Sequence, residues 1–189
     1  MKNIAIFASG NGTNAERIIK YFKDSDIAQV NVVFTNNKNA GVIKRAHALT
    51  VDVHIIGRDD FYNSNKVIAI LNNYNIDLIV LAGFLWLVPE LLISKFENKI
   101  INIHPALLPN YGGKGMYGMR VHEAVVAAGD AKSGITIHKV NKLYDEGQII
   151  FQAEVEIDKA ETPDSLAEKI HLLEYEHFPA VVEELLREI

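Results

Sequence analysis

Apolar residues in the first half of the chain occur in short runs, and helical patterns separate them. The runs lie within residues 4–8, 30–34, 51–56, 77–83 and 100–103, as is typical of strands in a parallel sheet. Between them, residues 15–22, 40–49, 59–74 and 89–96 carry apolar positions three and four apart, which predicts four helices. In the last of these helices Leu91, Leu92 and Phe96 are expected to face the core. Five strands alternating with four helices predict an α/β fold, a doubly wound, mostly parallel Rossmann-like sheet with helices on both faces.

The pattern changes after Pro109. Four glycines fall between residues 110 and 119, and a loop with so little core of its own beside a strand end is typical of a lid or binding loop. A helix is predicted over residues 119–128. Residues 134–140 and 149–157 alternate apolar and polar side chains, which predicts an antiparallel C-terminal hairpin. Thr162 as N-cap and Pro163 at the first turn begin a final helix that runs to about residue 186.

Length and composition are those of an ordinary globular protein. The 189 residues suffice for one core, and no repeat or linker divides them, so residues 1–189 are expected to form a single domain. The net charge of −5, with no long basic block, argues against a nucleic-acid partner. Cysteine is absent, which excludes disulfides, thiolate catalysis and cysteine-ligated zinc.

The first residues run directly into a strand pattern. They lack the basic, apolar and small-residue segments of a signal peptide. The longest apolar runs are too short to span a bilayer. A cytoplasmic protein without a membrane partner is therefore the expectation.

One predicted strand ends in a polar pair that suits acyl-group transfer. Pro105 stops the strand, and because strand side chains alternate, Asn102 and His104 are expected on one face. An amide can donate to a developing oxyanion, and a neighbouring imidazole titrates near neutral pH. A cap or a hydrogen-bonded turn is the commoner explanation of so short a motif.

A glycine-containing turn joins the first predicted strand to the first predicted helix. Residues 9–14 read Ser-Gly-Asn-Gly-Thr-Asn, and the N–H groups at a helix N-terminus can bind an anion. The third glycine of a dinucleotide-binding turn is absent and no acidic residue ends the next strand, so a nicotinamide site is not favoured. A phosphate site and a plain tight turn both remain consistent with this stretch.

Together these segments resemble a known family. Six segments are similar to those of the folate-dependent formyltransferases. They are the turn at residues 9–14, Leu-Ala-Gly-Phe at 81–84, Asn-Ile-His-Pro at 102–105, Leu-Leu-Pro at 107–109, Gly-Ile-Thr-Ile-His at 134–138 and Tyr-Asp-Glu-Gly at 144–147. The short length and the glycine-containing turn resemble the branch that formylates glycinamide ribonucleotide in purine biosynthesis. The resemblance covers essentially the whole chain. It implies the formyltransferase fold and formyl transfer from 10-formyltetrahydrofolate, with no metal.

The resemblance also implies roles for individual residues. The implied catalytic residues are Asn102, which would donate to the oxyanion, His104, which would move a proton, and Asp145, which would hold the imidazole. The implied substrate-binding residues are Gly12, Thr13, Asn14 and Glu174. The implied folate-binding residues are Leu85, Trp86, Leu87, Val88 and Asn102. Without the resemblance, Glu174 would be interpreted as a solvated helix residue and residues 85–88 as a strand extension.

The chain departs from the family near the expected folate tail. Many relatives carry Arg where this chain has Trp86, and an Arg expected near Phe61 is not evident, since Arg58 does not align. How the glutamate tail is held is left open. The remaining histidines are interpreted as structural or surface residues: His47, His54, His122, His138, His171 and His177. Their dispersed spacing predicts no metal site.

Three other functions compete with this interpretation. A methionyl-tRNA formyltransferase would be expected to add a C-terminal nucleic-acid-binding domain, and a formyltetrahydrofolate deformylase an N-terminal regulatory domain. A catalytically silent nucleotide-binding domain would have no reason to combine Asn102, His104 and Asp145. The expected partners are small-molecule substrates, glycinamide ribonucleotide and formyl-folate, bound by a monomer or homodimer.

Overall fold

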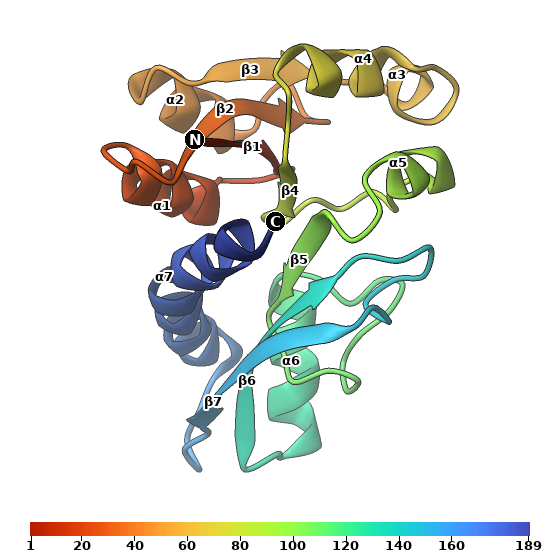
Figure 1. Ribbon diagram of the computed structural model, residues 1–189. Helices are drawn as coiled ribbons and strands as arrows, with labels where there is room; N and C mark the ends of the chain where they lie inside the picture. Colours follow the sequence, from red (N-terminus) through yellow and green to blue (C-terminus); the bar gives the residue numbers. More distant parts are fainter.

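The computed structural model describes residues 1–189 as one seven-stranded sheet flanked by helices (Figure 1). The strands are β1 (Lys2–Phe7), β2 (Ala28–Thr35), β3 (Asp52–Ile55), β4 (Leu78–Leu81), β5 (Ile100–His104), β6 (Lys132–Lys139) and β7 (Ile149–Glu156). The helices are α1 (Thr13–Phe22), α2 (Gly41–Ala48), α3 (Arg58–Tyr62), α4 (Lys66–Asn73), α5 (Glu90–Lys95), α6 (Met119–Ala128) and α7 (Pro163–Glu188).

The strand order is β3-β2-β1-β4-β5-β6-β7. The strands β1 to β5 pair in parallel, whereas β6 is antiparallel to β5, and β7 is antiparallel to β6. The prediction of a mostly parallel sheet that ends in an antiparallel hairpin is confirmed. Thr162 caps α7 through a capping box with Ser165, and Pro163 occupies the first turn, as the sequence predicts.

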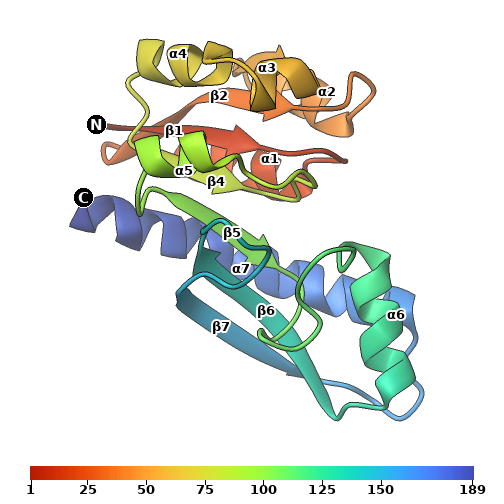
Figure 2. The same cartoon turned by 90° about the vertical axis from the view of Figure 1, so that its right-hand side faces the viewer.

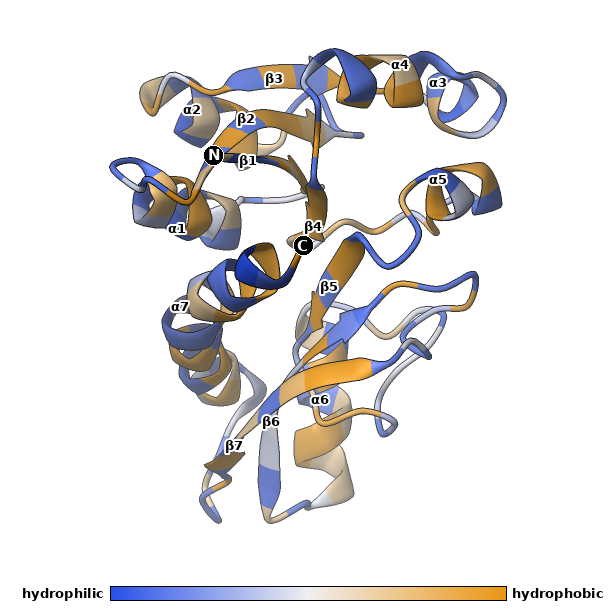
Figure 3. Cartoon of the chain, in the orientation of Figure 1, coloured by the Kyte–Doolittle hydropathy of each residue, from blue (hydrophilic) through white to orange (hydrophobic).

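Two apolar cores lie on opposite faces of the sheet. Alternation along β1 sends Ile4 and Ile6 into one core and Ala5 and Phe7 into the other. Helices α1, α2, α6 and α7 pack on the first face, and α3, α4 and α5 on the second, as Figure 2 shows from the side. Apolar residues follow the strands and the inner sides of the helices (Figure 3). None of the helices combines the length and apolar content that a membrane span requires.

Two sequence predictions in the α3–α5 region are wrong. The single helix predicted over residues 59–74 is two helices, α3 and α4. Between them, Ser64 Oγ donates to the Asp60 carbonyl and Asn63 Nδ2 donates to Asp59 Oδ1. These local side-chain hydrogen bonds compete with continuation of the helix. The first half of the chain therefore holds five helices between its strands, and not four. Leu91 is exposed, because α5 is only six residues long and buries a single stripe through Leu92.

The order of strands reverses at β1, which lies between β2 and β4. Sheets of this kind bind ligands beyond the C-terminal ends of the strands, at the reversal. The loops after β1, β4 and β5 emerge there and bring residues 9–14, 82–89 and 105–118 together. Gly12 precedes α1 with φ of 78°, and a Cβ at this position would lie 2.5 Å from the Val42 side chain. Only glycine fits this turn.

Candidate active site

A cavity of about 860 Å³ opens where these loops meet. The loop after β6 and one side of α7 complete its walls. Every site residue expected from the sequence lines it: Gly12, Thr13, Asn14, Leu85, Trp86, Leu87, Val88, Asn102, His104, Asp145 and Glu174. The fold therefore brings together residues such as Asn14 and Glu174, which are 160 positions apart in the chain.

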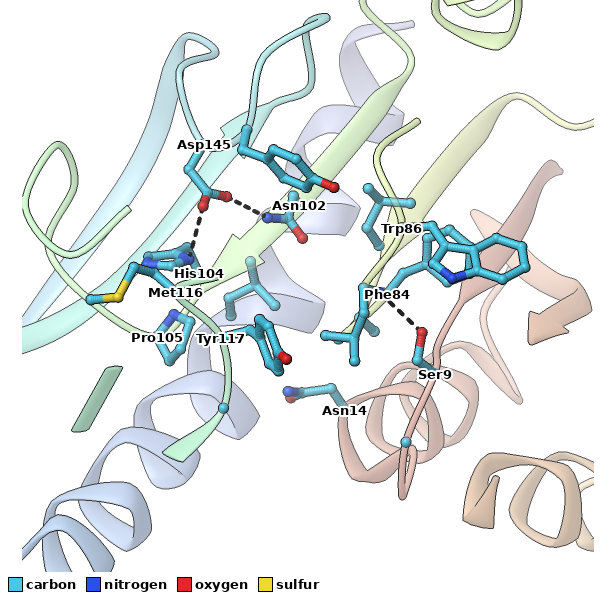
Figure 4. A pocket seen from close by; sticks show the side chains of 18 of the residues that line it. Ser9, Asn14, Phe84, Trp86, Asn102, His104, Pro105, Met116, Tyr117 and Asp145 are labelled. Carbon is cyan, nitrogen blue, oxygen red and sulfur yellow. Dashed lines mark hydrogen bonds and ion pairs between the residues drawn. The ribbon is translucent and has the colours of Figure 1, made fainter. Parts of the chain in front are cut away.

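Asn102, His104 and Asp145 form a cluster at one end of the cavity, in which His104 is buried and the other two are half-buried (Figure 4). Asn102 and His104 point to the same side of β5, and Asp145 reaches them from the loop between β6 and β7. Asn102 Nδ2 donates to Asp145 Oδ1 at 3.4 Å, and His104 Nδ1 lies 3.6 Å from Asp145 Oδ2. The carboxylate thus bridges the amide and the imidazole.

His138 is a fourth member of this cluster that the sequence interpretation missed. Its Nε2 lies 3.1 Å from Asn102 Nδ2 and 3.6 Å from Asp145 Oδ1. Its Nδ1 lies 2.9 Å from the Lys139 carbonyl, which can only accept, so Nδ1 carries the proton and Nε2 accepts from Asn102 when the ring is neutral. Asn102 is paired with His138 in the β5–β6 register. The alternation of residues 135–138 was the available signal, but it identifies the neighbour only once the register is known.

Asp145 remains an anion in this setting. Burial by itself would raise the pKa of Asp145, but His138, the charge of His104 and the Gly113 amide outweigh it, and the pKa lies below its ordinary value. The Gly113 N–H donates to Asp145 Oδ2 at 3.0 Å, so the glycine-rich loop is attached to the cluster. Asp145 itself has φ of 56°, in the left-handed region that Asp adopts more readily than most non-glycine residues.

His104 is almost fully enclosed, with 4% of its side chain exposed. Burial lowers the pKa of His104 below its ordinary value, and the Asp145 carboxylate and the Tyr111 carbonyl offset this only in part. Because of this lowered pKa, the His104 imidazole is mostly neutral at pH 7, and a neutral imidazole can accept a proton from an amine.

The opposite end of the cavity holds Asn14 and Glu174. Asn14 lies in the first turn of α1, and its Nδ2 donates to Glu174 Oε2 of α7 at 2.8 Å. Burial raises the pKa of Glu174 to about 7, although the Asn14 hydrogen bond opposes this rise. Interpreting Glu174 alone as a solvated helix residue would be wrong, because packing of α7 against α1 buries it. Asn14 Oδ1 is also buried and has no partner.

The segment of residues 85–88 is a loop, so the alternative of a strand extension is wrong. Ser9, just after β1, holds it: Ser9 Oγ accepts the Leu85 N–H at 3.0 Å (Figure 4). The Ser9 N–H donates to the Gly83 carbonyl at 3.0 Å. Tyr62 donates from its hydroxyl to the Leu87 carbonyl at 3.0 Å. These bonds leave the main-chain N–H groups of Trp86 and Leu87 without partners in the protein.

Trp86 belongs to an aromatic wall beside this loop. Its ring centroid lies 5.7 Å from that of Phe61, 5.9 Å from Tyr62 and 6.1 Å from Phe84. The Arg58 guanidinium carbon stands 5.1 Å from the centre of the indole. A cation–π contact therefore places a positive charge beside Trp86, the position at which many relatives are expected to carry Arg.

Two further histidines face the cavity. His122 and His171 line it, whereas His47, His54 and His177 do not. Burial, followed by the nearby His171, lowers the pKa of His122 to about 4, so this ring is neutral at physiological pH. No group of three or more histidine, aspartate or glutamate side chains converges as a metal site. The cavity thus combines a charged cluster, a helix N-terminus with a buried carboxyl group, and an apolar wall with free main-chain amides.

Known proteins are similar to this chain in sequence and in architecture. The formyl transferase family matches residues 2–182 of the chain. A relative named phosphoribosylglycinamide formyltransferase, chloroplastic, from Arabidopsis thaliana is 36% identical, and the alignment covers 98% of this chain and 67% of the plant protein. A Bacillus subtilis phosphoribosylglycinamide formyltransferase is 35% identical over 98% of this chain and 95% of its own length. The crystal structure of phosphoribosylglycinamide formyltransferase from Bacillus halodurans superimposes with a TM-score of 0.87 at 35% identity, covering 98% and 95% of the two chains.

Proposed function

This chain belongs to the formyl transferase family, and we propose that it transfers the formyl group of 10-formyltetrahydrofolate to the amine of glycinamide ribonucleotide. The products would be formylglycinamide ribonucleotide and tetrahydrofolate, in de novo purine biosynthesis. The observation that carries the proposal is that one cavity holds both the Asn102–His104–Asp145 cluster and a helix N-terminus able to bind phosphate. The cavity that contains both ends has a volume of about 860 Å³, which is in the range of small-molecule sites.

The cluster supports the proton movements of an acyl transfer. The formyl-folate supplies the electrophilic formyl carbon. Asn102 donates to the formyl oxygen as negative charge builds on it, which requires the long bond to Asp145 to give way. His104 accepts the proton that the attacking amine loses and delivers it to the leaving nitrogen of the folate. Asp145 orients the imidazole and stabilises its charged form.

The other end of the cavity suits a ribonucleotide. Gly12, Thr13 and Asn14 present the first N–H groups of α1, where the helix dipole favours an anion. Glu174 stands beside this turn and can bond a ribose hydroxyl or an amide. We assign these four residues to the ribonucleotide.

The loop after β4 suits a flat heterocycle. The free main-chain amides of Trp86 and Leu87 can hydrogen-bond the edge of the pterin, and Leu85 and Val88 supply apolar contact, with Asn102 at the formyl end. Because recognition runs through the backbone, the side chain at position 86 need not be charged. We assign residues 85–88 and Asn102 to the folate.

A steady-state assay with both substrates tests the proposal. Formation of tetrahydrofolate should depend on glycinamide ribonucleotide. The His104→Ala variant should have the same Tm as the wild type and a turnover at least ~10²-fold slower. Release of formate without the ribonucleotide would instead indicate a hydrolase, and no reaction would indicate a silent domain. We also propose that the protein is cytoplasmic and forms a monomer or a homodimer. Cell fractionation measures the compartment, and sedimentation measures the oligomeric state.

A further inference from the structure

A backbone carbonyl outside the cavity faces His104. The Nε2 atom of His104 lies 2.8 Å from the Tyr111 carbonyl oxygen. A carbonyl can only accept, so Nε2 must carry a proton. Nδ1 is then the nitrogen that faces Asp145, 3.6 Å from Oδ2. The Tyr111 carbonyl therefore decides which ring nitrogen gains and loses the proton beside the carboxylate.

Tyr111 holds this carbonyl through an unusual conformation. Its φ is 55°, in the left-handed region that bulky residues rarely enter. A residue stays in such a conformation only where its surroundings hold it. The Tyr111 hydroxyl donates to Asp130 Oδ2 at 2.6 Å, which is a strong, charge-assisted bond. Asp130 lies in the turn between α6 and β6, so the bond attaches the start of the loop to the sheet.

Neither side chain lines the substrate cavity; both border a separate small pocket. We propose that Tyr111 and Asp130 are a positioning pair that fixes the Tyr111 carbonyl against His104 Nε2 and so reserves Nδ1 for proton transfer. The kinetic part of this proposal rests on the formyl transfer proposed above. The tautomer of His104 can be measured without any substrate.

Nitrogen chemical shifts of His104 in the ligand-free protein test the tautomer directly. In the wild type the neutral ring should carry its proton on Nε2. Tyr111→Phe keeps the aromatic ring and removes only the hydroxyl. It should release the carbonyl and produce a mixture of the two tautomers, because an Nδ1–H can then bond Asp145. Retention of the pure Nε2–H tautomer in Tyr111→Phe would overturn the proposal.

Kinetics test whether the pair matters for turnover. Tyr111→Phe should lower kcat about tenfold, which equals about 1.4 kcal/mol of activation free energy, with little change in either KM. Asp130→Ala should have the same effect, and the double variant should be no slower than either single variant, because all three lose one bond. Asp130→Asn still accepts from the hydroxyl and should retain most of the activity. Additive losses, or a loss confined to KM, would contradict a positioning role.

Tyr74 offers a matched control. Its hydroxyl donates to Asp52 Oδ2 at 2.6 Å, the same kind of bond, and neither residue lines the cavity. Tyr74→Phe should cost similar unfolding free energy and leave kcat unchanged. An equal loss of kcat in both variants would attribute the effect to general destabilisation and overturn the proposal. If the wild type transfers no formyl group, the proposed function fails, and the tautomer measurement still decides on the pair.

Discussion

The two ends of the cavity each hold a carboxyl group that is at least half-buried against an asparagine amide, and yet the pKa values of the two groups shift in opposite directions. Asn102 donates to Asp145, whose pKa lies below its ordinary value. Asn14 donates to Glu174, and burial raises the pKa of that group to about 7. Two similar pairs in one cavity therefore carry different charges.

The difference lies in the number of additional partners. Asp145 accepts the Gly113 N–H and lies 3.6 Å from two imidazoles, which stabilise the anion against the cost of burial when they are charged. Glu174 has only the Asn14 amide, and one neutral donor does not offset burial. A lasting charge is thus kept where the proposed proton transfer takes place. At the other end, a carboxyl group that is partly protonated near neutral pH would repel the phosphate of the proposed ribonucleotide less than a full anion would.

The largest effect should follow from neutralising the charged end. Asp145→Asn keeps the shape and the bond to Gly113 as far as an amide allows, but cannot stabilise a charged imidazole. We expect kcat to fall by at least ~10²-fold. Glu174→Gln, the same change at the other end, should mainly raise the KM for the ribonucleotide. Comparable losses of kcat from both changes would show that the two carboxyl groups do not have separate roles.

The stability of the two variants should respond to pH in opposite ways. Because the folded protein holds a proton on Glu174 up to about pH 7, whereas the unfolded chain releases it near 4.5, Glu174 lowers the unfolding free energy as pH rises through this window. Glu174→Gln should therefore add up to about 3 kcal/mol at pH 8 and little at pH 4.5. Chemical denaturation at both pH values measures this.

Asp145 supplies the contrast for that measurement. Because the pKa of Asp145 is lowered on folding, its charge stabilises the folded protein at any pH above 3.8, the ordinary pKa of the group. This contribution is lost as pH falls through the pKa of the folded state. Asp145→Asn should thus reduce the unfolding free energy at pH 8. Parallel pH profiles for the two variants would refute the assigned directions.

A change in the aromatic wall should affect neither carboxyl group. Trp86→Ala removes indole contacts with Phe61 and Tyr62 and should weaken formyl-folate binding by roughly 1–3 kcal/mol. Isothermal titration with a non-reactive folate should show this, while the ribonucleotide KM stays close to wild type. A loss of ribonucleotide affinity alone would assign Trp86 to the core and not to the folate site.

The smallest expected effect concerns the glycine-rich loop. Because the Gly113 amide donates to Asp145, Asp145→Ala should speed hydrogen exchange at Gly113 about tenfold, in line with the loss of one bond to a charged group. Glu174→Gln, at the far end, should leave that exchange rate unchanged. Exchange at Gly113 that is equally fast in the wild type would show that the bond is not maintained in solution.

Local patterns were sufficient for most of the elements. The apolar runs placed the strands, the three-and-four spacing placed α1 with Ala15, Ile18, Ile19 and Phe22 buried, and Thr162 with Pro163 placed the start of α7. These signals lie within a few residues of one another, so each element can be deduced alone. The same reasoning failed between α3 and α4. The apolar positions on both sides predicted one continuous helix, but three short polar residues, Asn63, Ser64 and Asn65, separate the two helices.

The candidate site shows the limit of such reasoning. The pairing of Asn102 with His104 follows from strand alternation, and the turn at residues 9–14 could be interpreted as a phosphate site or a tight turn. Asp145, Glu174 and residues 85–88 were assigned only through a family resemblance. His138 was missed because its contact with Asn102 spans 36 positions and depends on the register of two antiparallel strands. The burial of Glu174 depends on α7 packing against α1 across 160 positions.

The sequence by itself determined the strands, most helices and the chemical types available at each loop, because hydrophobic periodicity and capping act over short distances. Only the tertiary structure decided which side chains meet and which charges they carry. Asp145 and Glu174 are both acids in the sequence, and neither pKa can be deduced from it. Those pKa values are set by burial and by partners that distant segments bring into contact.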